Sequence, residues 1–301
     1  MRVVSVLPSA TEIVWALGHG SELVGRSAEC DFPPEARSLP VVMKPRTLDA
    51  ERPSGEIDRR VVEARGRGES LYSLDVPLLR SLRPELLLTQ DLCGVCSVTE
   101  REVADACAAA GVRPRVVSLS PHRLDEVWAS VAEVGRAVGD PAAGDRLAGS
   151  LRHRASPRGA GPGHRVAIVE WLDPPILAGL WTPEIVTAAG GLPLGPGPGE
   201  VGQRTSWAEI AGLRPDLLVL SPCSFSVERS VRELREPRLG RAIGTVRPPL
   251  GTFVADEAYF SRPGPRLADG IDLVRNLLRG ETSPAPMPVA RWSAIAPGVS
   301  A

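Results

Sequence analysis

The 301-residue sequence lacks several features that would mark particular classes of protein. Aromatic residues make up 4% of the chain, and Lys44 is the only lysine among its 35 basic residues. The formal net charge is −1, so no attraction to nucleic acid or to an anionic membrane surface is expected. No run reaches the ~20 apolar residues that a membrane-spanning helix requires, so no membrane span is predicted.

Motifs for common enzymatic reactions are also missing. The sequence has no phosphate-binding Walker loop and no G-x-G-x-x-G fingerprint between a strand and a helix. The four histidines lie in turns or beside loops, without a recognisable Ser-His-Asp arrangement. No reaction is therefore predicted from motifs.

What the sequence does have is an ordinary globular composition, with 43% hydrophobic and 24% charged residues. Short apolar runs alternate with helical patterns, which predicts doubly wound α/β structure. The expected strands are residues 3–7, 23–26, 85–89, 115–119, 165–170, 216–220 and 252–254. The expected helices are residues 11–17 (with Ser9 as N-cap), 57–65, 76–82, 99–110, 184–189, 207–213, 227–235 and 264–278.

A longer helical stretch divides the α/β pattern into two halves. Residues 124–138 carry apolar side chains at helical spacing, Gly139-Asp140-Pro141 interrupts them, and 142–154 resume the pattern. Leu-Arg-Pro-Glu-Leu at 82–86 recurs as Leu-Arg-Pro-Asp-Leu at 213–217, which predicts two similar lobes. The predicted organisation is an N-terminal α/β lobe (1–122), a connecting helix (123–156), a C-terminal α/β lobe (157–280) and an extended tail (281–301).

Four of the five cysteines lie where an apolar run ends and a turn begins. In an open parallel sheet, loops at the carboxyl ends of the strands line the ligand crevice. Four thiols brought together there would suit zinc, iron or an iron–sulfur cluster. The candidate metal ligands are Cys30, Cys93, Cys96 and Cys223.

Two other interpretations of the cysteines stay open. Each could be a small buried hydrophobic residue, and the C-x-x-C at residues 93–96 could be a redox pair. The fifth cysteine, Cys107, lies beside alanines in an expected helix and is interpreted as core.

Aromatic and charged residues in turns of the second half are candidate ligand contacts. Trp171, Trp181 and Trp207 lie at element boundaries, where flat side chains suit a large or apolar ligand. Tyr259 and Arg262 precede a rigid Pro-Gly-Pro turn, and the guanidinium suits carboxylate or phosphate. The alternatives are that the tryptophans pack between the lobes and that Arg262 pairs with a carboxylate in a structural turn.

Residues 2–18, Arg-Val-Val-Ser-Val-Leu-Pro-Ser-Ala-Thr-Glu-Ile-Val-Trp-Ala-Leu-Gly, resemble the mature N-terminus of the class III (helical-backbone) periplasmic substrate-binding proteins. These proteins serve ABC importers of cobalamin and iron–siderophores. Residues 23–27, 82–86 and 259–266 fit the same family, and the resemblance covers about residues 2–279. Residues 29–31 and 89–96 look like those of a cysteine-containing, leaderless, cobalamin-binding-like subgroup.

The resemblance implies two α/β lobes joined by one long backbone helix, with the ligand in a cleft between them. It implies a binding module for a corrinoid or another metal chelate, with an ABC permease as partner. The tryptophans and Tyr259 would pack against the macrocycle and Arg262 would meet its anionic groups. Further implied ligand contacts are Ser9, Gln90 and Glu170.

A second hypothesis is a cytosolic metalloprotein or metalloenzyme on the same fold. The four cysteines would then hold a metal or iron–sulfur cluster, with Glu170, Asp31 or Gln90 near an open position. Pro8 and Glu12 interrupt the first apolar run, and no signal-peptide cleavage site follows at the usual distance. We therefore expect a cytoplasmic protein, or a periplasmic or extracellular one if a leader precedes this sequence.

Overall fold

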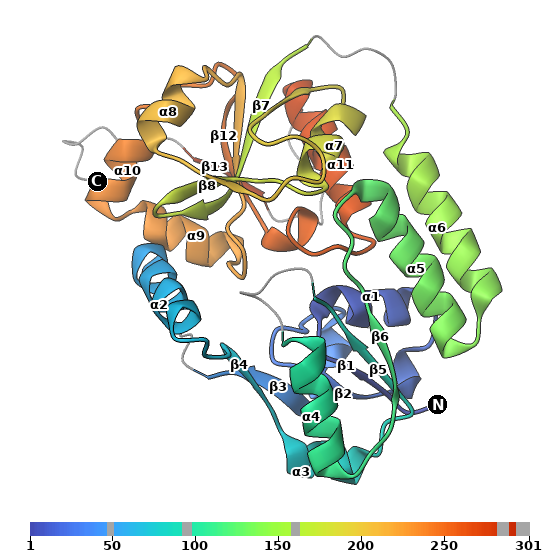
Figure 1. Ribbon diagram of the computed structural model, residues 1–301. Helices are drawn as coiled ribbons and strands as arrows, with labels where there is room; N and C mark the ends of the chain where they lie inside the picture. The colour runs from blue at the N-terminus through green and yellow to red at the C-terminus, as the bar shows by residue number, and fades with distance from the viewer. Residues whose placement is uncertain (47–50, 92–97, 158–162, 282–288, 293–301) are drawn as a thin grey trace. The chain divides into compact units, whose positions relative to one another are not determined.

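Two sheets organise the chain, a mainly parallel one in the N-terminal unit and a mixed one in the C-terminal unit (Figure 1). The computed structural model describes residues 1–46, 51–91, 98–157, 163–281 and 289–292. The N-terminal unit comprises Met1–Asp49, Arg59–Arg154 and Pro263–Pro265. The C-terminal unit comprises Ala50–Asp58, Ala155–Arg262 and Arg266–Ala301.

The sheet of the N-terminal unit has the strand order β4-β3-β2-β1-β5-β6. Every neighbouring pair is parallel except β3 and β4. Central strands of a parallel sheet are buried on both faces, which explains the continuous apolar runs of Val3-Val4 and Leu86-Leu87-Leu88. The strands are β1 (Val3–Ser5), β2 (Leu23–Ser27), β3 (Val41–Pro45), β4 (Tyr72–Leu74), β5 (Leu86–Thr89) and β6 (Arg115–Ser118).

Helices cover this sheet. Side chains of α3 and α4, including Leu79 and Val103, share one apolar cluster with Val4 and Leu87 of the sheet. A capping box is present at the start of α4, with Glu102 accepting from the backbone and hydroxyl of Thr99. The elements are α1 (Pro8–Ala16), η1 (Gly20–Glu22), η2 (Pro34–Ser38), α2 (Ser54–Gly66), α3 (Val76–Leu82), α4 (Glu100–Ala110), α5 (Leu124–Val138) and α6 (Pro141–Ala155).

The connecting segment consists of two helices, where the resemblance implied one. Helix α5 ends at Gly139, which adopts a left-handed conformation (φ +90°), and α6 starts at Pro141. The interruption predicted at residues 139–141 is therefore present. The two helices pack closely, because a Cβ added at Gly135 of α5 would lie 2.6 Å from the Cα of Gly144 in α6.

The sheet of the C-terminal unit has the order β10-β8-β7-β11-β12-β13, and β9 also pairs with β7. Strands β7, β11 and β12 form its parallel centre. Strands β8 and β13 run antiparallel to their neighbours β7 and β12. The strands are β7 (Arg165–Leu172), β8 (Pro175–Leu177), β9 (Leu192–Leu194), β10 (Gln203–Arg204), β11 (Leu217–Leu220), β12 (Gly251–Ala255) and β13 (Val289–Trp292).

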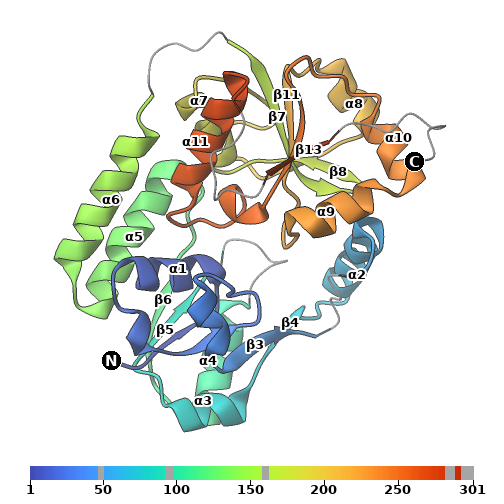
Figure 2. The same cartoon turned by 180° about the vertical axis from the view of Figure 1, so that it is seen from behind.

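Helices lie on both faces of this second sheet (Figures 1 and 2). Helices α8, α9 and α10 share an apolar cluster with the sheet that includes Ile210, Leu234 and Ile243. Helices α7 and α11 pack together on the other face. The helices are α7 (Thr182–Ala188), α8 (Trp207–Gly212), α9 (Val227–Leu234), α10 (Pro237–Ile243), η3 (Glu257–Tyr259) and α11 (Leu267–Leu278).

The α/β fold class is confirmed, and individual elements differ from the prediction. Helix α1 has Leu7 as its N-cap and Pro8 as its first residue, so the expected N-cap Ser9 lies inside the helix. Proline suits this position, because the first N–H of a helix has no partner within it. The prediction omitted α10 and the short strands β3, β4, β8, β9, β10 and β13. Strand β13 lies in the expected tail and pairs with β12.

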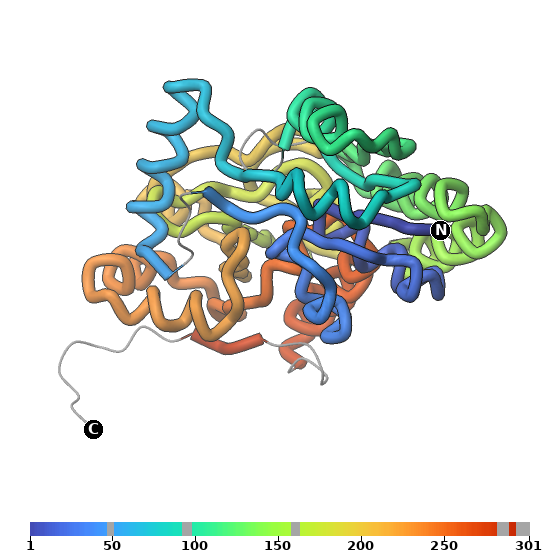
Figure 3. The backbone as a smooth tube through the Cα atoms, turned by 90° about the horizontal axis from the view of Figure 1, so that it is seen from below, coloured from blue at the N-terminus to red at the C-terminus, as the bar shows by residue number. Residues whose placement is uncertain are grey.

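The start of α2 belongs to the C-terminal unit, although it lies early in the sequence. In Figure 3 this light-blue segment approaches the orange α9. Its contacts with α9 are hydrogen bonds and ion pairs of residues 51–54. Among the described residues, no helix combines the length and apolar character needed to cross a bilayer.

Candidate functional site

The N-terminal unit places several hydroxyl groups just after the carboxyl ends of its strands. Ser9, in the first turn of α1, is 2% exposed, and Thr89 at the end of β5 is fully buried. Neither hydroxyl has a hydrogen-bond partner within the described part of the chain. Gln90 follows Thr89 and is half-buried. Gly264 packs against Ser9, since a Cβ added there would lie 3.4 Å from the Ser9 Cβ.

Cys30 follows β2 in the same unit and is 1% exposed. Thr11 in α1 brings its Oγ1 to 3.1 Å from the Cys30 Sγ and to 2.9 Å from the hydroxyl of Ser5. The Cys30 thiol therefore lies beside the hydroxyl of Thr11, which also contacts the hydroxyl of Ser5.

The metal-site hypothesis finds no support in the described structure. Cys223 is half-buried after β11, where its backbone N–H donates to the carbonyl of Glu170 (3.0 Å). Cys93 and Cys96 lie outside the described residues. Within the ranges given above, no group of three or more His, Cys, Asp or Glu side chains is arranged to hold a metal ion. Cys107 is buried in α4, as expected for a core residue, and burial raises the pKa of its thiol.

The three candidate tryptophans lie in the C-terminal unit in different environments. Trp181 is 3% exposed, and its indole Nε1 donates to the carbonyl of Phe260 (2.6 Å). Trp207 is 8% exposed, and its Nε1 donates to the carbonyl of Leu172 (3.2 Å). Both indoles are thus held by the backbone inside the unit.

Trp171 differs from the other two. It is half-buried near the carboxyl end of β7, and its Nε1 has no hydrogen-bond partner among the described residues. Its ring meets that of Phe225, which follows β11, at a centroid distance of 5.4 Å and an interplanar angle of 51°. The ring is partly exposed and can contact a ligand, whereas the Nε1 atom itself is buried.

Glu170 precedes Trp171 in β7 and is also half-buried. A Cβ added at Gly202 would lie 2.0 Å from its Oε1. Glycine at this position therefore leaves the space that the Glu170 carboxylate occupies.

The turn after β12 contains Tyr259 and Arg262. Tyr259 ends η3 and is 7% exposed. The Nε of Arg262 donates to Oε1 of Glu257 (2.6 Å), and both side chains are about nine-tenths buried. This is the arginine–carboxylate pair that the structural alternative predicted. The pairing fixes the position of the guanidinium within this turn.

Asp256 at the start of this turn was not among the predicted site residues. Its Oδ1 accepts from the backbone N–H of Ala258 (3.1 Å), and its carbonyl accepts from the hydroxyl of Ser221 (3.2 Å). Burial raises the pKa of its carboxyl, and nearby Glu257 adds to the effect, while the Ala258 N–H and two arginines oppose it. Phe225, the partner of Trp171, was also missed because a lone phenylalanine after Ser-Pro-Cys-Ser carries no pattern.

Known proteins of similar sequence match only short parts of the chain. No family model matches the sequence. The vitamin B12-binding protein of Photorhabdus laumondii is 42% identical over 52 residues, 17% of this chain and 19% of that protein. The vitamin B12-binding protein of Vibrio cholerae is 32% identical over 83 residues, 24% of this chain and 30% of that protein. The chain thus matches less than a third of the length of these curated relatives.

Solved structures match over almost the whole chain. A periplasmic haem-binding protein from Pseudomonas aeruginosa has a TM-score of 0.70 at 20% identity, covering 97% of this chain and 98% of that one. The periplasmic vitamin B12-binding protein of Vibrio cholerae has a TM-score of 0.61 at 19% identity, covering 92% and 96%. The haem-binding protein of a Roseiflexus species has a TM-score of 0.62 at 22% identity, covering 93% and 98%.

The chain shares its fold with these periplasmic binding proteins, and the resemblance stated from the sequence is confirmed at the level of fold. The similar solved structures include binders of haem and of vitamin B12. They are described as periplasmic, and none of them supports the cytoplasmic location, the iron–sulfur cluster or the zinc site.

Proposed function

We propose that this protein is a binding protein for a metal chelate of the corrinoid class. The observation that carries the proposal is Trp171, a half-buried indole near the carboxyl end of β7 whose ring packs on Phe225. A corrinoid offers a large flat ring for the indole and peripheral amides that accept and donate hydrogen bonds. The short segments shared with vitamin B12-binding proteins favour this chelate over others.

Each unit carries candidate ligand contacts of its own. In the N-terminal unit, the candidate polar contacts are Ser9 and Gln90, of which Gln90 is half-buried and Ser9 is almost fully buried. In the C-terminal unit, Glu170 and Trp171 would make direct contacts. Tyr259 and Arg262 would complete the site from the turn after β12.

Trp181 and Trp207 take a supporting part in this proposal. Their N–H groups are already bonded to backbone carbonyls, and their rings are almost fully buried. They would shape the walls of the C-terminal unit rather than donate to the ligand.

A binding protein of this kind would pass its ligand to an ABC permease. This role favours a periplasmic or extracellular location over a cytoplasmic one. A transporter substrate-binding protein from Listeria monocytogenes shares the fold at a TM-score of 0.60, which supports the proposed role.

The test is isothermal titration of the purified full chain with cyanocobalamin, and in parallel with haemin. Saturable 1:1 binding of cyanocobalamin, weakened by Trp171→Phe and by Glu170→Gln, is expected. Trp292→Phe, on the edge strand β13, is the matched control and should bind as the parent does. Tight binding of haemin without binding of cyanocobalamin would replace the corrinoid by a porphyrin, and binding of neither would overturn the proposal.

A further inference from the structure

A row of side-chain contacts leads away from Trp171 inside the C-terminal unit. Trp171 packs on Phe225, which is 1% exposed. The guanidinium of Arg229, in the first turn of α9, lies over the same phenylalanine ring, with its Cζ 4.2 Å from the ring centroid. A cation above an aromatic face is attracted by the ring quadrupole, most strongly when both are shielded from water.

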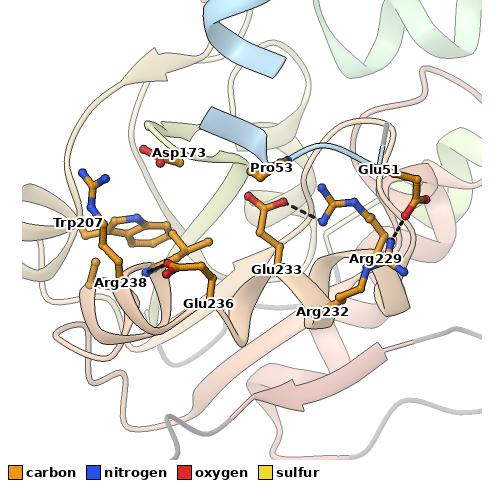
Figure 4. A pocket seen from close by; sticks show the side chains of 11 residues that line it. Glu51, Pro53, Asp173, Trp207, Arg229, Arg232, Glu233, Glu236 and Arg238 are labelled. Atoms are coloured by element: carbon orange, nitrogen blue, oxygen red, sulfur yellow. Dashed lines mark hydrogen bonds and ion pairs between the residues drawn. The ribbon is translucent and has the colours of Figure 1, made fainter. Parts of the chain in front are cut away.

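Arg229 is held by partners on its other side (Figure 4). Its Nη1 lies 2.9 Å from Oε2 of Glu233, and these two side chains are 9% and 7% exposed. Its Nη2 donates to the carbonyl of Arg52, just before α2. A planar guanidinium with three different partners has little freedom to rotate.

Glu233 is itself fixed by the start of α2. Its Oε1 accepts from the backbone N–H of Ser54 (2.8 Å) and from the Ser54 hydroxyl. Arg232 pairs with Glu51 nearby, and Arg204 pairs with Asp58 through two hydrogen bonds of 2.7 and 3.0 Å. We call these contacts of residues 51–58 with the rest of the C-terminal unit the α2 anchor.

The surroundings of Arg229 are not closely packed on every side. A hollow of about 510 Å³ adjoins the anchor and is lined by Glu51, Trp207, Arg229 and Glu233 among others (Figure 4). The side chains that make the anchor therefore adjoin open space.

Trp171 depends on this arrangement more than the other tryptophans do. The indoles of Trp181 and Trp207 are fixed by hydrogen bonds to backbone carbonyls, whereas the Trp171 N–H has no such bond among the described residues. The contact with Phe225 is therefore one interaction through which this row of side chains can act on the Trp171 ring.

We propose that Arg229 is a positioning residue for Trp171. Through Phe225, Arg229 couples the hydrogen bonds and ion pairs of the α2 anchor to the orientation of the indole. Its consequence for ligand binding rests on the function proposed above, while the positioning itself does not. Weakening the anchor would turn the indole and lower ligand affinity without removing any ligand contact.

The test uses the full chain labelled with 5-fluorotryptophan and observed by ¹⁹F NMR. The six tryptophans give separate resonances, and Trp171→Phe identifies the one from residue 171. Arg229→Lys keeps the charge opposite Glu233 but loses the planar contact with Phe225. Ser54→Ala weakens the anchor from its other end. Both should move or broaden the Trp171 resonance and leave that of Trp128, in the N-terminal unit, in place.

Arg235→Lys is the matched control, since Arg235 is an exposed arginine at the end of the same helix. It should leave every resonance unchanged. If Arg229→Lys and Ser54→Ala also leave the Trp171 resonance unchanged, the positioning role is overturned. Movement of all six resonances would mean general disruption and would equally overturn it.

The ligand measurement is kept separate. Titration with cyanocobalamin should give a dissociation constant about three- to tenfold higher in Arg229→Lys than in Arg235→Lys. If the parent binds no cyanocobalamin while its Trp171 resonance still responds, the proposed function fails and the positioning role stands. If the parent binds and Arg229→Lys binds equally well, the coupling to the ligand is overturned.

Discussion

Ser54 and Glu233 are 179 residues apart in the sequence and are joined by two buried hydrogen bonds. The backbone N–H and the hydroxyl of Ser54 both donate to the same carboxylate oxygen, Oε1 of Glu233. Ser54 is fully buried and begins α2. A carboxylate at this position satisfies an N–H that the helix leaves free and interacts favourably with the helix dipole. The pair therefore fixes the start of α2 on the C-terminal unit.

The first prediction follows from this pair. Ser54→Ala removes one donor and should lower the free energy of unfolding by about 1 kcal/mol. Glu233→Gln removes the charge opposite the buried Arg229 and should cost more, about 3 kcal/mol, because an uncompensated charge stays buried. Urea denaturation followed by circular dichroism measures both. Arg67→Ala, which removes an exposed pair with Glu69, is the control. Equal midpoints for Glu233→Gln and this control would contradict the assignment.

A second prediction concerns the contact between α5 and α6. A Cβ at Gly144 would lie 3.0 Å from the Cα of Gly135 and 3.2 Å from that of Ala132, whereas one at Gly149 would meet nothing within 4 Å. Gly144→Ala should thus destabilise the protein by about 1–3 kcal/mol through overpacking. Gly149→Ala, in the same helix, should stabilise it by about 0.5–1 kcal/mol. Thermal unfolding of the two variants compares them directly, and an equal shift in both would refute the close packing.

A third prediction concerns pH. Burial raises the pKa of Asp256 above its ordinary value of 3.8, so the folded state binds this proton more tightly than the unfolded state does. Its contribution to stability is fully present below the unfolded pKa and is lost as pH rises through the folded pKa. Asp256→Asn should lack this loss. We therefore expect the urea midpoint of the parent, measured between pH 3 and 7, to fall relative to that of the variant as the pH rises above about 4.

The matched control for the pH series is Asp105→Asn, an exposed residue of α4. Its midpoint should follow that of the parent across the whole range. A constant difference between Asp256→Asn and the parent at every pH would show that the carboxyl does not titrate abnormally.

The internal repeat shows how much of the fold local sequence determines. Arg83 and Arg214 both adopt left-handed backbone conformations, with φ of 45° and 49°. The acidic residues that follow, Glu85 and Asp216, each accept from the backbone N–H at the start of a neighbouring strand, at 2.7 Å in both cases. A five-residue match thus predicted the same helix–strand junction in both units, and in each the acidic side chain also bonds to a strand that lies 83 or 51 residues away in the sequence.

Elements that depend on distant partners escaped prediction. Strand β13 is stabilised by antiparallel pairing with β12, and its own residues follow a proline-rich stretch with no strand pattern. The α2 anchor likewise joins residues 51–58 to α9 through charges that also occur on ordinary exposed helices. The spacing of apolar residues predicts whether a segment is a helix or a strand, but it does not predict which distant segment it packs against.

The candidate site shows the same division. The sequence singled out three tryptophans at element boundaries, and only the structure distinguishes them by the partners of their indole N–H groups. The carboxylate partner of Arg262, Glu257, lies five residues away and matches the alternative left open at the start. The cysteine hypothesis required convergence of loops from separate strands, which spacing alone does not establish.

The last prediction uses the same substitution at two of these tryptophans. Trp181→Phe deprives the buried Phe260 carbonyl of its donor and should lower the free energy of unfolding by about 1–3 kcal/mol. Trp171→Phe removes an N–H with no partner among the described residues and should cost distinctly less. Ligand binding should show the reverse order, because the Trp171 ring is partly exposed whereas the Trp181 ring is almost fully buried. Urea denaturation and titration with cyanocobalamin, made on both variants, test the two orders together. If Trp171→Phe were the more destabilising change, its indole would be a structural residue, and the ligand contact assigned to it would have to move elsewhere in the turn after β7.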